Sequence, residues 1–259
     1  MILLIAGTTE GRVLFNLLKG SGLKMAVSFL TEYGSHLLKG EHGDKIELLR
    51  GPLDKEHLVK IIQQKGITEI IDASHPFAVE ISKNALETSR EQGVAYFRFE
   101  RPSIALPKHS LIKQVSGFQE AAKEAVCFGK VIFLTVGVKN LEPFIWQAKE
   151  HGRDVVARVL PLESSIQACR EKGLQPPQIL ALQGPGSREL NRELLKYYKA
   201  GVLVTKDSGA AGGTAAKIEA ALELDIPVIF IQRPSLDYGK HVYYGADELV
   251  KEVLLNKST

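Results

Sequence analysis

Short apolar runs alternate with amphipathic segments along almost the whole chain, and this alternation limits the possible folds more than any other feature. Residues 2–6 form a continuous apolar run, which is typical of a strand covered on both faces. The next segment carries Val13, Leu14, Leu17 and Leu18 at helical spacing and ends at closely spaced glycines. Repeated strand–helix units of this kind build a mostly parallel sheet. The pattern therefore predicts an α/β protein.

Predicted strands recur through both halves of the chain. They cover residues 2–6, 24–30, 45–49, 69–73 and 95–99 in the first half, and 130–135, 154–159, 178–182, 201–205 and 227–231 in the second. His75-Pro76 is predicted to open a long helix, because proline suits the first turn of a helix. A terminal helix is predicted over residues 247–255.

Two prolines, Pro102 and Pro107, interrupt the rhythm between the halves. We place a crossover from this point to about Gly129. The prediction is two Rossmann-like three-layer domains with mostly parallel sheets, an N-terminal dinucleotide-binding domain over 1–128 and a C-terminal domain over 129–259.

The charge balance excludes some classes of partner. The chain has 33 basic and 30 acidic residues, a formal net charge of +3 and no long Lys/Arg run, so nucleic acid is not expected. No apolar stretch approaches the ~20 residues that span a bilayer. The two cysteines, Cys127 and Cys169, form no metal-type pair. We therefore expect a cytoplasmic protein, a monomer or small homo-oligomer, without a membrane segment or a metal site.

A glycine-bearing turn follows the first predicted strand and opens the first predicted helix. It is formed by Gly7, Thr8, Thr9, Glu10 and Gly11. Small residues let the backbone approach a diphosphate, and the N–H groups at a helix N-terminus attract an anion. The spacing is not G-x-G-x-x-G, so a tight turn without a ligand is the alternative to a cofactor site.

The ends of strands two and three carry further candidates for holding the cofactor. An acid near the end of strand two commonly holds the ribose hydroxyls of NAD, and Glu32 lies near that place. Thr31, Ser35 and Arg50 could instead bind a 2′-phosphate. Arg50 also reads as a solvated surface residue, and the sequence leaves NADH and NADPH both open.

The segment after strand four, Asp72-Ala73-Ser74-His75-Pro76, places a hydroxyl and an imidazole beside the same crevice. Ser74 and His75 are candidates for cofactor or substrate contact. The alternative is that one of them caps the following helix.

A charged group ends strand five. Arg98 and Arg101 flank Glu100. The arginines suit the binding of substrate carboxylates, and pairing of Glu100 with one of them is the structural alternative.

The most unusual segment of the chain joins Thr205-Lys206-Asp207-Ser208-Gly209 to Gly212, Gly213 and Thr214 at the next helix start. Three glycines, a charged pair and a helix terminus exceed what a plain turn needs. The preceding turn, 183–187, ends a neighbouring strand and is a candidate for lining the same cleft.

Seven motifs in order resemble the precorrin-6A reductases of cobalamin synthesis. They are GTTEGR, DASHPFA, YFRFERP, LTVG, ARVLP, LALQGPGSRELN and VTKDSGAAGGTAAKIEAA, and the resemblance runs from about residue 2 to residue 234. The resemblance implies two Rossmann-like domains with a nicotinamide cofactor, NADPH or NADH, in the cleft between them. The implied reaction reduces one ring double bond of precorrin-6A or cobalt-precorrin-6A to the 6B form.

The implied substrate is a flat tetrapyrrole that bears many carboxylates, and basic or small residues at strand ends complement it. The candidate substrate-binding residues are Arg98, Arg101, Lys139, Arg158, Gly184, Ser187, Arg188, Lys206 and Ser208. The candidate cofactor-binding residues are Gly7, Thr8, Thr9, Glu10, Gly11, Thr31, Ser35, Arg50, Ser74, His75, Gly212, Gly213 and Thr214. As the proton donor, Asp207, paired with Lys206, is the first candidate, His75 the second and water the third.

Two other functions compete with this one. A short-chain-type reductase or epimerase needs a Tyr-x-x-x-Lys pair on the helix after strand five, and none lies there. A non-enzymatic dinucleotide sensor needs an effector segment, which the sequence does not display.

Overall fold

The computed structural model describes residues 1–29, 45–209 and 212–256. It contains two compact units. Unit 1 comprises Met1–Arg101 together with Ser235–Thr259, and unit 2 comprises Pro102–Pro234. We describe each unit by itself.

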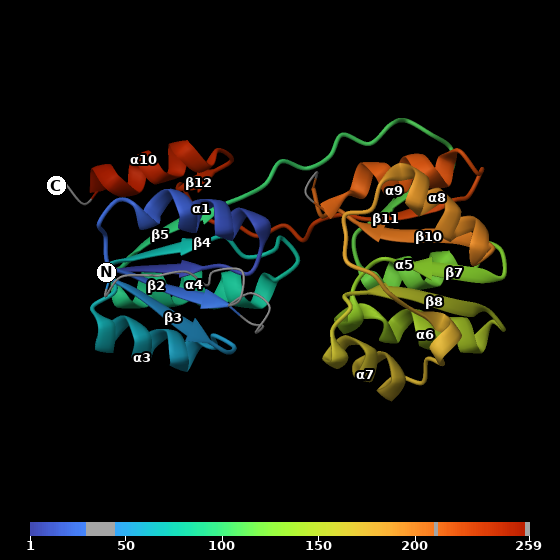
Figure 1. Ribbon diagram of the computed structural model, residues 1–259, viewed down its shortest axis with the longest axis horizontal. Coiled ribbons are helices and arrows are strands. Elements are labelled where there is room, and N and C mark those ends of the chain that lie inside the picture. The colour runs from blue at the N-terminus through green and yellow to red at the C-terminus, as the bar shows by residue number, and fades with distance from the viewer. Residues whose placement is uncertain (30–44, 210–211, 257–259) are drawn as a thin grey trace. The chain divides into compact units, whose positions relative to one another are not determined.

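Unit 1 is a six-stranded, wholly parallel sheet with helices on both faces (Figure 1). The strands are β1 (Ile2–Ile5), β2 (Met25–Phe29), β3 (Ile46–Arg50), β4 (Glu69–Asp72), β5 (Ala95–Phe99) and β12 (Val242–Tyr243). Their order is β12-β5-β4-β1-β2-β3. The helices are α1 (Thr9–Lys19), α3 (Lys55–Lys65), α4 (Val79–Gln92) and α10 (Ala246–Asn256).

Two apolar layers hold the unit-1 sheet between its helices. On one face, Leu14 and Leu18 of α1 and Leu249 of α10 pack against alternate residues of the strands. On the other face, Leu58 of α3 and Leu86 of α4 pack against the remaining alternate residues. Burial on both faces explains why the strands read as continuous apolar runs.

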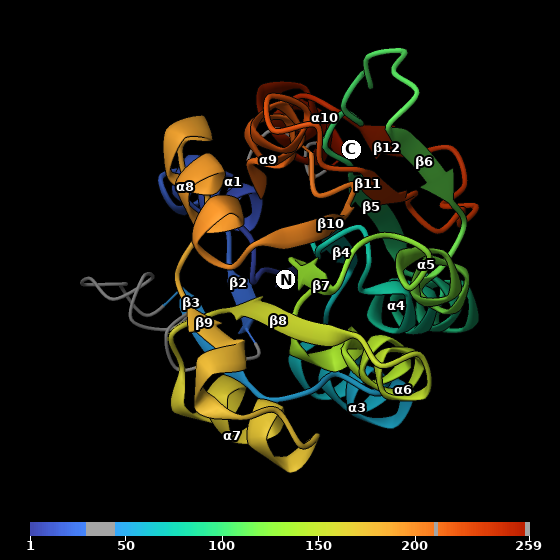
Figure 2. The ribbon, with the colours of Figure 1, turned by 90° about the vertical axis from the view of Figure 1, so that its right-hand side faces the viewer.

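Unit 2 repeats this architecture (Figure 2). Its strands are β6 (Ile112–Val115), β7 (Val131–Leu134), β8 (Asp154–Val159), β9 (Ile179–Ala181), β10 (Ala200–Lys206) and β11 (Val228–Ile231). Their order is β6-β11-β10-β7-β8-β9, again wholly parallel. The helices are α5 (Phe118–Ala125), α6 (Glu142–Glu150), α7 (Glu163–Glu171), α8 (Arg188–Tyr197) and α9 (Thr214–Leu222), with short 3-10 turns η1 (Val138–Asn140) and η2 (Pro176–Gln178).

Both strand orders correspond to the Rossmann order 3-2-1-4-5-6. The two-Rossmann-like α/β fold predicted from the sequence is therefore confirmed. In each unit, the sixth strand comes from outside the regular repeat. Unit 1 takes β12 from the C-terminal segment, and unit 2 takes β6 from the segment that precedes its first central strand.

The division of the chain differs from the expected boundary at residue 128. Residues 102–128, predicted as a crossover, contain β6 and α5, and β6 pairs with β11 of unit 2. The C-terminal segment joins unit 1, because β12 extends its sheet beside β5 and α10 packs on α1. The boundaries of the two units are set by pairing between strands that are far apart in sequence. The local hydrophobic pattern carries no information about such pairing.

Local predictions were mostly confirmed, with two corrections. The helix expected to open at His75-Pro76 begins at Val79 instead, because the chain first makes a turn there. In α1, Val13 and Leu17 are 45% and 41% exposed, since the buried stripe passes through their neighbours. Among the described residues, no helix has both the length and the apolarity needed to cross a membrane.

Candidate functional site

The candidate site residues gather where ligands bind in open parallel sheets. In a doubly wound sheet this place lies at the carboxyl ends of the two central strands, where the strand order reverses. In unit 1 these strands are β1 and β4, and in unit 2 they are β7 and β10. We therefore examine one set of loops in each unit.

The β1–α1 turn of unit 1 has the backbone that a diphosphate-binding turn requires. Gly7 has φ +139°, a conformation that other residues rarely adopt, and a side-chain carbon there would meet no neighbouring atom. At Gly11 the helix packs directly on the strand end, because a Cβ would lie only 2.9 Å from the Ala6 Cα. At the start of α1 the Gly11 N–H is capped by Thr8, which leaves the Thr9 and Glu10 N–H groups to an anion.

Thr8 is the N-cap of α1 and does not serve as a free hydroxyl donor. Its Oγ1 accepts a hydrogen bond from the Gly11 N–H at 3.0 Å and donates one to the Ala73 carbonyl at 2.9 Å. A hydroxyl has one proton, and here it is already used. Thr8 therefore ties the two central loops of unit 1 together. Thr9 Oγ1 accepts a hydrogen bond from Arg12 Nη2 at 3.1 Å, and its hydroxyl proton can still be donated to a ligand.

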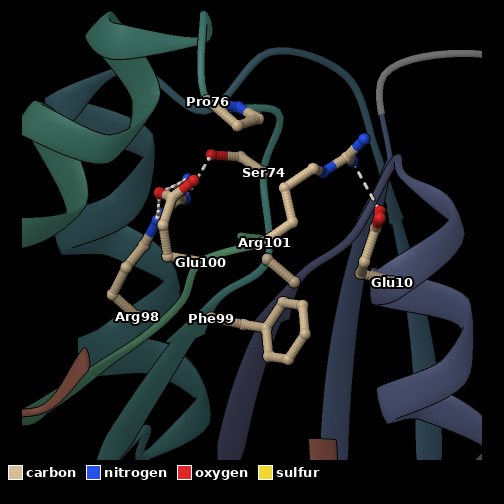
Figure 3. A pocket seen from close by; sticks show the side chains of 8 residues that line it. Glu10, Ser74, Pro76, Arg98, Phe99, Glu100 and Arg101 are labelled. Atoms are coloured by element: carbon tan, nitrogen blue, oxygen red, sulfur yellow. Dashed lines mark hydrogen bonds and ion pairs between the residues drawn. The ribbon is translucent and has the colours of Figure 1, made fainter. Parts of the chain in front are cut away.

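A small pocket lies beside the start of α1 (Figure 3). It is lined by Glu10, Ala73, Ser74, Pro76, Arg98, Phe99, Glu100 and Arg101. Glu10 and Arg101 form an ion pair across it. Four of these eight residues, Glu10, Ser74, Arg98 and Arg101, were predicted from the sequence to touch cofactor or substrate, and the fold brings them together from the ends of β1, β4 and β5.

Beneath this pocket lies a buried charge network centred on Arg98, whose side chain is 0% exposed. Its Nη1 lies 3.0 Å from Asp72 Oδ1, and its Nη2 lies 2.8 Å from Glu100 Oε2. Nη1 also donates to Ser74 Oγ at 3.1 Å, and the guanidinium stands over the Tyr238 ring. These contacts confirm the predicted pairing of Glu100 with one arginine. They also leave Arg98 no surface to offer a substrate in this structure.

The network shifts the ionisation of its members. Burial alone would raise the pKa of Asp72, but Arg98 and hydrogen bonds from Ser82 and Ser74 outweigh it and hold that pKa below its ordinary value. The pKa of Tyr96 is raised by burial and by its hydrogen bond to Asp72. Asp72 is therefore an ionised, fully partnered carboxylate.

Neither Ser74 nor His75 caps the helix that follows. The N-cap of α4 is Ala78, which makes no side-chain cap bond. Ser74 instead joins the Arg98 network and lies 3.1 Å from Ser82 Oγ. His75 Nδ1 accepts the Phe77 N–H at 3.1 Å, so a neutral ring carries its proton on Nε2.

In unit 2, Asp207 anchors the glycine-rich loop that follows β10. Its Oδ2 lies 2.9 Å from Arg233 Nε, and its Oδ1 accepts the Gly209 N–H at 3.2 Å. The predicted partner was Lys206, whereas the contact that defines the carboxylate's position is with Arg233. Asp207 is also buried. These contacts assign it a part in holding the loop.

The glycines of this loop are required by close packing. A Cβ on Gly212 would lie 2.2 Å from Ser208 Cβ, and one on Gly213 would lie 2.6 Å from Pro185 Cβ. Gly213 also has φ +62°. The β10–α9 loop therefore lies directly against the β9–α8 loop at Pro185. The segments around residues 183–187 and 205–214 were predicted from the sequence to line one cleft, and they are in contact.

Three cationic side chains converge beside these loops, and we call them the unit-2 cationic cluster: Arg158 of β8, Lys206 of β10 and Lys217 of α9. Arg158 and Lys217 are each only 9% exposed. Arg158 Nη1 donates to Asn191 Oδ1 at 2.9 Å, a neutral partner, while the Asn191 amide donates to the backbone of the β9–α8 loop. The charge of Arg158 is positioned without being neutralised.

Lys217 is the site residue that sequence reasoning missed. Burial, with Arg158 and Lys206 nearby, lowers its pKa to about 7. The available signal was a single cation in the otherwise small and apolar run of α9, directly after the glycine-rich loop.

The remaining predicted residues lie apart from these two centres or outside the described residues. Lys139 is exposed in η1, after β7. Ser187 is the N-cap of α8, and Arg188 pairs with Glu223 at 2.8 Å. Arg50 is exposed at the end of β3. Thr31 and Ser35 lie outside the described residues.

With this geometry in view, comparison with known proteins is decisive. The family model described as Precorrin-6x reductase CbiJ/CobK matches residues 1–253. The chain belongs to this family. A cobalt-precorrin-6A reductase of Priestia megaterium is 38% identical over 261 residues, covering 100% of this chain and 99% of that protein. Another, of Methanocaldococcus jannaschii, is 37% identical and covers 97% of each chain.

A solved structure supports the same assignment for this precorrin-6x reductase family member. The structure, titled CobK precorrin-6A reductase, has a TM-score of 0.74 and 25% identity, and covers 98% of this chain and 96% of its own. The likeness therefore includes both units.

Proposed function

We propose that this protein uses a reduced nicotinamide nucleotide to reduce one ring double bond of cobalt-precorrin-6A, giving the 6B form. The observation that carries the proposal is the family match over residues 1–253, which includes both Rossmann-like units and their loops. The cofactor supplies hydride when bound. The protein's own task is to bind, orient and exclude water.

The β1–α1 turn of unit 1 fits the diphosphate of such a cofactor. Gly7 offers an unobstructed backbone, α1 offers its first N–H groups, and Thr9 offers a hydroxyl. Glu10 would repel a phosphate, but its ion pair with Arg101 offsets that charge. We therefore assign Gly7 and Thr9 to the cofactor directly, and Thr8 and Gly11 to the positioning of the turn.

Arg50 supports NADPH over NADH. It is the register partner of Phe29, the last residue of β2, and the end of β2 is where the adenosine ribose lies in this fold. A guanidinium there is suited to a 2′-phosphate. Replacing Arg50 by Gln should raise the KM for NADPH and leave the KM for NADH unchanged.

One observation supports the cobalt-containing form of the substrate. The relatives at 38% and 37% identity are both named cobalt-precorrin-6A reductase, whereas the solved structure named precorrin-6A reductase is 25% identical. The substrate's carboxylates require cationic partners, and the described residues supply Arg101 in unit 1 and the cationic cluster in unit 2.

For the proton, His75 is better placed than Asp207. The Nδ1 of His75 accepts the Phe77 N–H, so a neutral ring carries its proton on Nε2, the nitrogen from which a proton donor would act. Asp207 is held on both oxygens. His75→Asn should therefore slow turnover at unchanged NADPH affinity, and Asp207→Asn should act mainly by loosening its loop. Equal turnover by His75→Asn and the unaltered protein would leave solvent as the donor.

The test of the proposed function is a reduction assay under anaerobic conditions with purified protein, cobalt-precorrin-6A and NADPH. We expect NADPH absorbance to fall only when the tetrapyrrole is present, with a product heavier by one hydride and one proton. Hydride-deuterated NADPH should pass its label to the product. Precorrin-6A without cobalt serves as the second substrate. If neither tetrapyrrole supports NADPH or NADH oxidation, the proposal is wrong.

A further inference from the structure

Two members of the unit-2 cationic cluster, Arg158 and Lys217, lie where water barely reaches and have no acidic partner among the described residues. Burial of a charge is unfavourable unless an opposite charge or a set of hydrogen bonds accompanies it. Within the described residues, Lys217 makes no hydrogen bond or ion pair, and the charged groups that act on it are Arg158 and Lys206, both cations. The cluster therefore costs stability as it stands.

The neighbouring elements add to this positive charge. Lys217 lies in the first turn of α9, where the helix dipole is itself positive and disfavours a lysine. Arg158 projects from β8, with its Nη2 close to both glycines of the Gly184-Pro185-Gly186 turn. Asp207, which follows Lys206 in the sequence, is held by Arg233 and the Gly209 N–H. Glu219, two residues after Lys217 in α9, is exposed, whereas Lys217 is buried.

A purely structural lysine does not explain this arrangement. A methionine would fill the same volume in α9 without the cost of desolvating an amine. Asn191 uses its carbonyl to fix Arg158 and its amide to fix the adjoining loop, so the guanidinium is oriented while it keeps its charge. Fixed, unneutralised cations around a glycine-lined loop are what an anion-binding site needs.

We propose that Arg158, Lys206 and Lys217 form an oxyanion-binding site in unit 2 that takes a carboxylate of the tetrapyrrole substrate. The inference rests on the proposed function for the identity of that carboxylate. The same chemistry would bind a phosphate of the nicotinamide nucleotide, and the experiment separates the two sources. An oxyanion at the site restores the missing counter-charge, so its arrival also favours the protonated form of Lys217.

The decisive variant is Lys217→Met, which removes a buried amine and should fold at least as well as the unaltered protein. A hydrogen bond between charged groups contributes about 1.5–3 kcal/mol, so we expect the KM for cobalt-precorrin-6A to rise roughly 10- to 100-fold. The KM for NADPH should stay unchanged. Lys196→Met is the matched control, because Lys196 is an exposed lysine of unit 2 that pairs with Glu193, and it should change neither KM.

A second readout distinguishes an anion site from a packing role. In the unaltered protein, the KM for the tetrapyrrole should rise as the pH increases above about 7, because Lys217 must be protonated to bind. The Met variant should lose this dependence, while Lys217→Arg should retain the charge and most of the affinity. Calorimetric titration of cobalt-precorrin-6A, NADPH and NADH into each variant gives the same comparison without turnover.

The outcomes are distinct. A loss of tetrapyrrole affinity alone supports the carboxylate, and a loss of NADPH affinity alone supports an oxyanion site that takes the cofactor's phosphate. If Lys217→Met and the control bind all three ligands as the unaltered protein does, at every pH, the inference is overturned. Absence of turnover by the unaltered protein would instead count against the proposed function, while calorimetry would still test the site.

Discussion

Removing the Arg98 guanidinium should destabilise unit 1 by more than any surface charge change and leave unit 2 untouched. In Arg98→Met, the fully buried Asp72 carboxylate loses its cation, and Glu100 loses two hydrogen bonds. Breaking a buried ion pair by deleting one partner costs about 3–5 kcal/mol, because the other charge stays buried and unpaired. For a unit of this size, that corresponds to a fall of about 10–20 °C in its melting temperature.

The pH dependence of this loss tests its cause. In the unaltered protein the pKa of Asp72 is lowered, so its contribution to stability is present above the ordinary aspartate value of about 3.9 and is lost as the pH falls through the native value. Without Arg98, burial dominates and the pKa of Asp72 should be raised. The variant should then recover part of its stability relative to the unaltered protein as the pH is lowered from neutral toward about 4, the ordinary pKa of an aspartate.

Hydrogen exchange followed by mass spectrometry separates the two units in a single experiment. Peptides covering β4 and β5 should lose protection in Arg98→Met, and peptides covering β7 and β10 should not. Arg192→Met is the control, because its ion pair with Glu193 is exposed and contributes about 1 kcal/mol or less. The Asp72→Asn/Arg98→Met double variant should lose less than the sum of the single losses. A loss below about 1 kcal/mol, the size of a surface pair, in Arg98→Met would refute the reasoning.

Three other outcomes are expected. Gly11→Ala should lower the free energy of unfolding by about 1–3 kcal/mol and weaken NADPH binding, because the added Cβ would lie 2.9 Å from the backbone of Ala6. Gly20→Ala, whose Cβ would meet no atom, should change neither quantity. Denaturant unfolding and calorimetry measure the two quantities, and equal effects of the two variants would contradict the prediction. Gly213→Ala should lower the stability of unit 2 by about 1–3 kcal/mol, because the added Cβ would lie 2.6 Å from Pro185 Cβ. It should also raise the KM for the tetrapyrrole more than the KM for NADPH. An unchanged denaturation midpoint would contradict the prediction. The pKa of Lys217 is lowered to about 7, so above that pH the unfolded chain binds more protons than the folded protein does. Unit 2 should therefore become more stable as the pH rises from about 7 toward 10. Lys217→Met should abolish this rise, as measured by unfolding at a series of pH values.

The sequence alone predicted the parts of the site that depend on local backbone. Gly7 was expected to make the turn after β1, and it has the positive φ that such a turn requires. The helices α3 and α4 end at Gly66 and Gly93 in left-handed C-caps, a conformation that glycine adopts without strain. Thr8 was expected to bind phosphate, but its hydroxyl is used between Gly11 and Ala73, a contact that joins positions far apart in sequence.

What the sequence by itself determined is the succession of strands and helices, the α/β class and the loops that carry glycine. These depend on hydrophobic periodicity and on allowed backbone conformations, both of which act within a few residues. Only the tertiary structure decided that Arg98 is buried with Asp72, that β6 and β12 complete the two sheets, and that Lys217 stands beside Arg158. Parallel strand order decides which strand ends become neighbours, so side chains distant in sequence share one desolvated place, and there their charges must be balanced by one another or by a ligand.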